Sequence, residues 1–221
     1  MYQFDTTGPI AVVLDIPAGH VRFVAADRAD TVVDVRPTNA AKSRDVQVAE
    51  QTTVEYADGV LRIVAAAKST LFGSSGSIEV SVQLPVDSTV EAKAAAAGFR
   101  TDGRLGDISF DGAYGEIVVD EAAGVRLTAL AGDISVGRLN GASEITTSKG
   151  DIRIGEAAGG NVVLRTQSGD LSVQAAHGVS ASLDAGTTYG RIENSLKNAD
   201  GTPQLTIHAT TAHGDISARS L

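Results

Sequence analysis

The sequence predicts an all-β protein, most of it a parallel β-solenoid (β-helix) with coils of about 18–20 residues. A five-residue signature carries this prediction: a glycine, usually followed by an acid, precedes alternating apolar and polar residues. Its seven copies are GDISF (106–110), GEIVV (115–119), GDISV (132–136), GDIRI (150–154), GDLSV (169–173), GRIEN (190–194) and GDISA (214–218). From the second copy onward their glycines lie 17, 18, 19, 21 and 24 residues apart. Such a period is typical of coils that bury their apolar faces only against neighbouring coils.

Composition supports the same fold class. Aromatic residues make up only 4% of the 221 residues, and Trp and Cys are absent. The chain relies on Val, Ile, Ala, Gly, Thr and Ser, which suit narrow pleated cores and tight corners. The length suffices for one large domain with a sizeable core.

An irregular N-terminal β region, residues 1–68, is expected to cap or continue into the repeats of 77–221, so that one domain results overall. Short alternating runs predict strands at residues 10–14, 21–24, 32–35, 46–54 and 60–64. Residues 69–77 are the expected flexible excursion, and 77–85 the next strand, which ends at Pro85. Residues 91–97, EAKAAAA, have helical propensity but also suit a crowded corner of a solenoid.

Within each copy the alternation assigns side chains to two faces. Ile134 and Val136 point to one face, whereas Asp133 and Ser135 point to the other. The outward positions are mostly small: Ser109, Val118, Ser135, Arg153, Ser172, Glu193 and Ser217. Repetition at one register implies parallel, in-register stacking. The signature glycines are the expected structural turns: Gly106, Gly115, Gly132, Gly150, Gly169, Gly190 and Gly214. A row of threonines is expected at one corner: Thr128, Thr146, Thr166, Thr187 and Thr210.

The motif Thr166-Gln167-Ser168-Gly169-Asp170-Leu171-Ser172-Val173, preceded by the strand Val80–Pro85, resembles a large bacterial family labelled putative adhesin, a domain of unknown function with β-strand repeats. The resemblance runs from about residue 8 to the C-terminus and includes Gly8-Pro9-Ile10 and Ala18-Gly19-His20-Val21. It implies a β-helical fold and no known catalytic residues. The label adds little about function, because function belongs to sites rather than folds.

Charge and terminal sequence exclude several classes. The net charge of −9 argues against nucleic-acid binding, which needs a basic face, and against attachment to an anionic membrane surface. Residues 1–17 lack the basic and apolar regions of a signal peptide, and no run approaches a membrane span. A soluble, cytoplasmic protein without membrane insertion is therefore expected.

The signature aspartates Asp107, Asp133, Asp151, Asp170 and Asp215 are the main candidates for chemistry. Stacked about 4.8 Å apart, they would repel one another unless something offset their charge. Backbone N–H groups at their own turns are the favoured offset, and a Ca²⁺ ladder is the alternative. Arg191 replaces the acid in one coil. No other cofactor is expected.

Catalytic and zinc chemistry have less support. The four histidines His20, His177, His208 and His213 show no H-x-H or H-x-x-x-H pair, so solvent-facing corners are expected for them. Tyr114 and Tyr189, each before a signature glycine, would form at most a small sugar-binding strip. Carbohydrate-active β-helix enzymes cluster acids in a cleft, whereas this sequence places its acids in a line.

The expected function is therefore a non-enzymatic binding or scaffold module for an unidentified protein or glycan partner. The alternatives are a self-assembling, bactofilin-like cytoskeletal β-helix and a carbohydrate-active enzyme. Self-association is expected through the C-terminal solenoid edge, because the chain stops directly after the repeat GDISA (214–218).

Overall fold

The computed structural model describes residues 1–65, 76–198 and 202–221, and it is all-β apart from one helix in the described ranges. The chain forms two compact units, Met1–Gly115 and Glu116–Leu221, each built on mostly parallel strands. The elements of the first unit are β1 (Tyr2–Asp5), β2 (Ala11–Ala26), β3 (Asp30–Pro37), α1 (Ser43–Gln51), β4 (Thr53–Ala57), β5 (Val60–Val64), β6 (Ile78–Pro85) and β7 (Thr89–Tyr114).

In the first unit, the long strand β2 lies between later segments of the chain. It pairs in parallel with β5 and β6 along one edge and with β7 along the other. Strands β3 and β4 add antiparallel partners to β6 and β5, and β1 pairs antiparallel with β3. A row of aromatic rings fills the interior, where Phe99 lies 5.8 Å from Phe23 and 4.8 Å from Phe110 between ring centroids. The predicted strands at 10–14, 21–24, 32–35, 60–64 and 77–85 are confirmed.

One local prediction in this unit is wrong. Residues 43–51 form helix α1 instead of the start of a strand at 46–54, because they consist mainly of good helix formers despite the alternating Val46 and Val48. The buried Asp45 carboxylate anchors the helix by accepting the backbone N–H of Ser77 at 3.0 Å. Residues 91–97, for which both a helix and a solenoid corner remained open, are part of strand β7, where parallel pairing with β2 outweighs their helical propensity. The excursion predicted at 69–77 lies, for 69–75, outside the described residues.

The second unit repeats one two-stranded coil. Its strands are β8 (Ile117–Ala131), β9 (Ile134–Leu139), β10 (Ser143–Lys149), β11 (Ile152–Ala157), β12 (Gly160–Ser168), β13 (Leu171–Ala175), β14 (Ala181–Tyr189), β15 (Ile192–Ser195), β16 (Leu205–His213) and β17 (Ile216–Ser220). The second half of β8 starts one ladder, which continues through β10, β12, β16 and β14. The first half of β8 starts the second ladder, which continues through β9, β11, β13, β17 and β15. All these pairings are parallel, as the sequence predicted.

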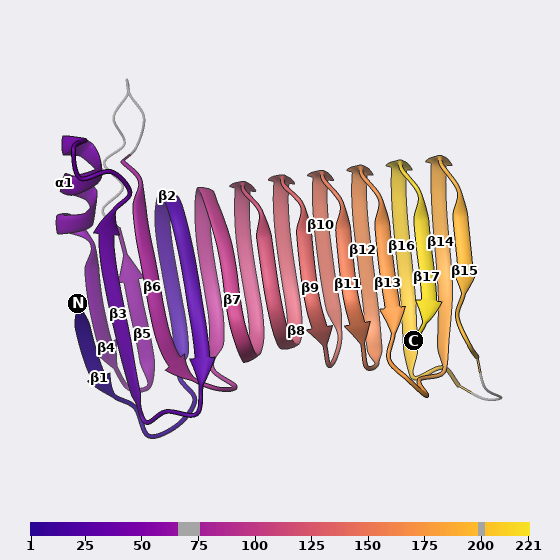
Figure 1. Cartoon of the computed structure of the whole chain (residues 1–221), viewed down its shortest axis with the longest axis horizontal. Helices are drawn as coiled ribbons and strands as arrows, with labels where there is room; N and C mark the ends of the chain where they lie inside the picture. Colours follow the sequence, from indigo (N-terminus) through magenta and orange to yellow (C-terminus); the bar gives the residue numbers. More distant parts are fainter. Residues whose placement is uncertain (66–75, 199–201) are drawn as a thin grey trace. The chain divides into compact units, whose positions relative to one another are not determined.

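The last coil in sequence is not the last coil in space. Strands β16 and β17 lie between the coil of β12 and β13 and the coil of β14 and β15 (Figure 1). The expectation that the C-terminal repeat forms the open edge is therefore corrected: that edge belongs to residues 181–195. The residue types give the reason, because Leu205 and Ala218 of the inner coil lie opposite Ala181 and Asn194 of the outer coil. The more apolar coil occupies the inner place.

Candidate functional site

The signature glycines permit close approach of successive coils. In Gly150 a Cβ atom would lie 2.2 Å from the carbonyl oxygen of Gly132, and its φ of 138° is one that side-chain-bearing residues rarely adopt. Five more of the predicted turn glycines share the positive φ, namely Gly115, Gly132, Gly169, Gly190 and Gly214, whereas Gly106 does not. These positions are structural, and they place the acids that follow them one above another.

Each signature aspartate of the second unit accepts a backbone N–H from the next coil. Asp133 Oδ1 accepts the N–H of Asp151 at 2.9 Å, and Asp151 Oδ1 that of Asp170 at 2.9 Å. Asp170 Oδ1 accepts the N–H of Asp215, and Asp215 Oδ1 that of Arg191, both at 2.8 Å. The predicted backbone donors belong to each residue's own turn, whereas the donors in the structure belong to the neighbouring coil.

Arg191 occupies the acid position in the outermost coil. Its guanidinium returns to Asp215, with Nη2 at 2.9 Å from Oδ2. The hydrogen bonds from the Arg191 backbone N–H and guanidinium lower the pKa of Asp215. The row of carboxylates is thus occupied along its length by backbone donors. In the described parts of the chain no group of three or more His, Asp or Glu side chains is arranged to hold a metal ion.

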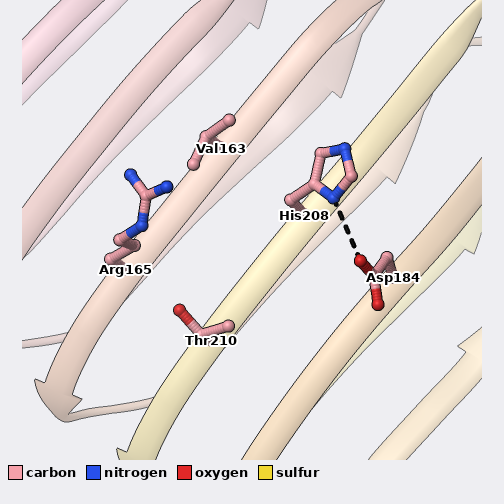
Figure 2. A pocket seen from close by; sticks show the side chains of 5 residues that line it. All are labelled: Val163, Arg165, Asp184, His208 and Thr210. Atoms are coloured by element: carbon pink, nitrogen blue, oxygen red, sulfur yellow. Dashed lines mark hydrogen bonds and ion pairs between the residues drawn. The ribbon is translucent and has the colours of Figure 1, made fainter.

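A shallow hollow opens instead on the outward face of the β12–β16–β14 ladder. Its volume is about 260 Å³, and its lining consists of Val163, Arg165, Asp184, His208 and Thr210. Figure 2 shows Val163 and Arg165 on one strand, His208 and Thr210 on the next, and Asp184 on the third. All five side chains project from alternate positions of three paired strands, so the sheet itself sets their spacing.

The strand register explains why a hollow forms here. Val163, His208 and Asp184 lie side by side in one row. In the next row Arg165 faces Thr210, and Thr210 faces Gly186, which has no side chain. A Cβ atom at Gly186 would meet nothing within 4 Å, so the space beside Thr210 is open.

The charges around the hollow alternate. Glu144 bridges two arginines, with Oε2 at 2.8 Å from Arg126 Nη1 and Oε1 at 3.1 Å from Arg165 Nη1. On the other side, His208 Nδ1 lies 3.2 Å from Asp184 Oδ2. The guanidinium of Arg165 carries five N–H donors, and only its Nη1 donates to Glu144. The site therefore combines a cation with spare donors, a hydroxyl, an imidazole–carboxylate pair and one apolar side chain.

The threonine row expected from the sequence is misaligned at two positions, and this hides the hollow. Thr166 and Thr187 do not lie beside Thr128, Thr146 and Thr210. In the structure Thr166 and Thr187 pair with Thr211 in an inward row, next to Thr147. The outward row is Thr128, Thr146, Arg165, Thr210 and Gly186. Counting from each signature glycine would have shown Arg165 and Gly186 as the two departures from threonine.

The other candidate residues do not converge on the hollow. His213 is stacked on Tyr189, with ring centroids 5.0 Å apart, at the end of the same ladder. Tyr189 and Tyr114 are 67% and 61% exposed. The outward row of the second ladder, which contains Ser135, Arg153, Ser172, Ser217 and Glu193, is confirmed. It consists mainly of small side chains. No described helix has the length and apolarity to cross a lipid bilayer.

In-register two-stranded coils and a polar outer face define a β-repeat protein. Residues 12–220 match the family model Toastrack DUF4097, and the chain belongs to this family, a domain of unknown function. No curated protein matches the chain in sequence.

Three solved structures are similar over nearly the whole chain. A putative adhesin from Parabacteroides distasonis ATCC 8503 is 13% identical, with a TM-score of 0.50, and the match covers 98% of this chain and 95% of that one. A putative cell adhesion protein from Clostridium sporogenes ATCC 15579 is 11% identical, with a TM-score of 0.42 and coverage of 100% and 98%. A putative adhesin from Bacteroides fragilis NCTC 9343 is 8% identical, with a TM-score of 0.44 and coverage of 98% and 95%. At such identities the likeness concerns the fold alone.

Proposed function

We propose that the protein is a non-enzymatic binding module, a β-solenoid whose outward face holds the acidic sugar residue of a glycan in the hollow around Arg165. The observation that carries this proposal is the hollow itself. It arises where Gly186 leaves space beside Thr210, and Arg165 lies in the same row. A solved structure of similar fold, from Parabacteroides distasonis, is described as a putative adhesin, and this description is consistent with a binding role.

The lining matches the chemistry of a sugar acid group by group. The planar guanidinium of Arg165 suits a carboxylate, to which it donates two parallel hydrogen bonds. The Thr210 hydroxyl and the His208–Asp184 pair offer donors and acceptors for ring hydroxyls. Val163 supplies an apolar surface for ring C–H groups. At about 260 Å³ the hollow is smaller than a drug-sized pocket, which favours one monosaccharide residue.

The same lining supports binding over catalysis. Glycoside hydrolysis generally uses two carboxyl groups that flank the scissile bond. One carboxylate, Asp184, lines the hollow, and its side chain is 82% exposed. The nearby Glu144 is bound by Arg126 and Arg165 at once. A module that holds a sugar without cleaving it fits these groups better than a carbohydrate-active enzyme does.

A titration with sodium glucuronate, followed by NMR chemical shifts of the isotope-labelled protein, tests the proposal. We expect shifts at Arg165, His208 and Thr210, and weaker ones with neutral methyl glucoside. The variant R165Q should lose about tenfold in affinity, because a hydrogen bond to a charged group contributes roughly 1.5 kcal/mol. The variant G186L should fill the hollow and abolish binding.

The matched control is R153Q, which removes an exposed arginine on the second ladder whose Nη2 lies 2.7 Å from Asp151 Oδ2. It should bind glucuronate as the wild type does. Equal affinities for glucuronate in the wild type and G186L, or no shifts at the hollow residues, would refute the proposal.

A further inference from the structure

The coil of β14 and β15 has a neighbour on one side only within the described residues. Strand β14 pairs with β16, and β15 pairs with β17. By contrast, each of β9 to β13, β16 and β17 pairs with a strand on both sides. An unpaired strand edge presents a row of backbone donors and acceptors to any chain that can form a matching strand.

Ile192 is the first residue of β15 and lies on this edge. In five coils the residue at its register donates its backbone N–H to the next coil: Ile117 to Asp133, Ile134 to Asp151, Ile152 to Asp170, Leu171 to Asp215 and Ile216 to Arg191. Ile192 holds the same register in the outermost coil, opposite Ile216. Its N–H therefore faces the open side. The side chain of Ile192 is 46% exposed, whereas the five equivalent side chains are at most 1% exposed.

We propose that a second copy of this chain docks on this edge through a short antiparallel bridge, in which residues 191–193 pair with residues 191–193 of the copy about a two-fold axis at Ile192. In an antiparallel pair, directly opposed residues can exchange both backbone hydrogen bonds. Ile192 opposite Ile192 of the second copy forms such a pair and covers both exposed side chains. The two-fold axis makes the same patch serve both partners, so the assembly closes as a dimer.

The charges beside Ile192 are what favour a second copy as the partner. The local sequence is Arg191-Ile192-Glu193. Antiparallel pairing centred on Ile192 places each Arg191 opposite Glu193 of the other copy, so two opposite-charge cross-strand pairs form at once. Because the whole chain has a net charge of −9, two copies repel at long range, and such local pairs are what the contact needs.

The existing contact of Arg191 is compatible with this pairing. Its Nη2 donates to Asp215 Oδ2 at 2.9 Å. The remaining guanidinium donors are sufficient for a second carboxylate. Arg191 would then lie between Asp215 of its own chain and Glu193 of the second copy. Parallel stacking of a further coil, as in a filament, would instead need an acceptor at position 191 for the backbone N–H of that coil. The other coils carry Asp at this position, but the guanidinium of Arg191 has no acceptor.

The test is a charge exchange followed by light scattering after size exclusion over a concentration series. The wild type should rise from 22.6 kDa to twice this mass. E193R places arginine opposite arginine, and R191E places glutamate opposite glutamate. Each variant alone should dimerise at least tenfold more weakly than the wild type. An equimolar mixture of E193R and R191E restores two opposite-charge pairs and should form a heterodimer.

Two further variants separate pairing from folding. I192P removes the backbone donor at the proposed two-fold axis, and proline is tolerated at such edge positions. It should abolish dimers while circular dichroism stays that of a β protein. S172R adds a charge in the same outward row, on the internal strand β13, and should leave the dimer intact.

The proposal is overturned by a wild type that stays monomeric up to about millimolar concentration, at which even weak contacts are populated. It is also overturned by growth beyond the dimer, by dimers that persist in both single charge variants, or by a mixture of the two that fails to associate although the wild type dimerises.

Discussion

The backbone N–H of Arg191 donates a 2.8 Å hydrogen bond to Oδ1 of Asp215, which lies 24 residues further along the chain. In the preceding coils, the donor comes later in sequence than the carboxylate that accepts it. The reversal marks the place where the chain passes outward at 181–195 and then returns inward at 205–220. It also explains why Arg191 is not an acid: no described coil lies beyond it to offer a backbone N–H.

Replacing Gly150 by alanine tests the close approach of coils. We expect G150A to lose roughly 2–5 kcal/mol of unfolding free energy, because the new Cβ would collide with the Gly132 carbonyl in a strained backbone conformation. Urea unfolding, monitored by circular dichroism, measures this loss.

The matched control is G186A, where open space surrounds the new methyl group. It should be neutral or gain a few tenths of a kcal/mol through the unfolded state. Similar losses for both variants would show that the approach at Gly150 does not limit the fold.

The aspartate row should respond to the loss of one acceptor. D170A leaves the backbone N–H of Asp215 without its 2.8 Å partner, and about 1 kcal/mol of unfolding free energy should be lost. D170N retains an amide oxygen at the same place and should recover most of this stability. The exposed D184A is the control in the same denaturation series, and a loss in D184A as large as in D170A would contradict the role assigned to the row.

Acid should weaken the contact between the two outermost coils. The hydrogen bonds from the Arg191 backbone N–H and guanidinium hold the pKa of Asp215 below its ordinary value of about 3.9. A lowered native pKa means that the contribution is fully present above the unfolded pKa and is lost as the pH falls through the native one.

The urea midpoint of the wild type should therefore converge on that of D215N as the pH drops below about 3.9, and exceed it at pH 6. A constant difference between the two proteins over this range would be inconsistent with the lowered pKa of Asp215.

Calcium should have no effect on thermal stability. The Oδ1 atoms of Asp133, Asp151, Asp170 and Asp215 already accept backbone N–H groups, which offset the repulsion that a cation would otherwise relieve. Melting temperatures with calcium and with a chelator should agree. A calcium-dependent rise that D151N and D170N remove would establish the alternative cation ladder.

The signature alone was enough to predict parallel, in-register strands, because its period-two alternation aligns Ile134, Ile152 and Leu171 on one buried face. The order of the coils needed more than spacing. Two residues nevertheless indicated it: Arg191 replaces the acid, and Asn194 takes the core position that is Ala218 in the neighbouring coil. Both are polar departures suited to an outermost coil.

Local and tertiary effects explain the remaining differences. Helix α1 (43–51) was predicted as strand because alternation at Val46 and Val48 resembles a β pattern in so short a segment. The hollow depends on three strands that are distant in sequence, so Arg165, His208 and Asp184 meet only once the coil order is known. A correct threonine register would still have identified Arg165 and Gly186 as unusual.

The position of β16 and β17 between two coils that precede them in sequence has a consequence for the time course of folding. Strands β12 and β14 both pair with β16 in the same register, so Gly160 and Ala181 each lie opposite Leu205. Until residues 205–220 are synthesised, 181–195 can occupy the site next to β12 and β13 that β16 and β17 fill in the native state. Residues 181–195 must then leave that site before the final coil enters. Folding of the second unit should accordingly include a slow step of strand exchange, which a chain lacking 205–221 would not show.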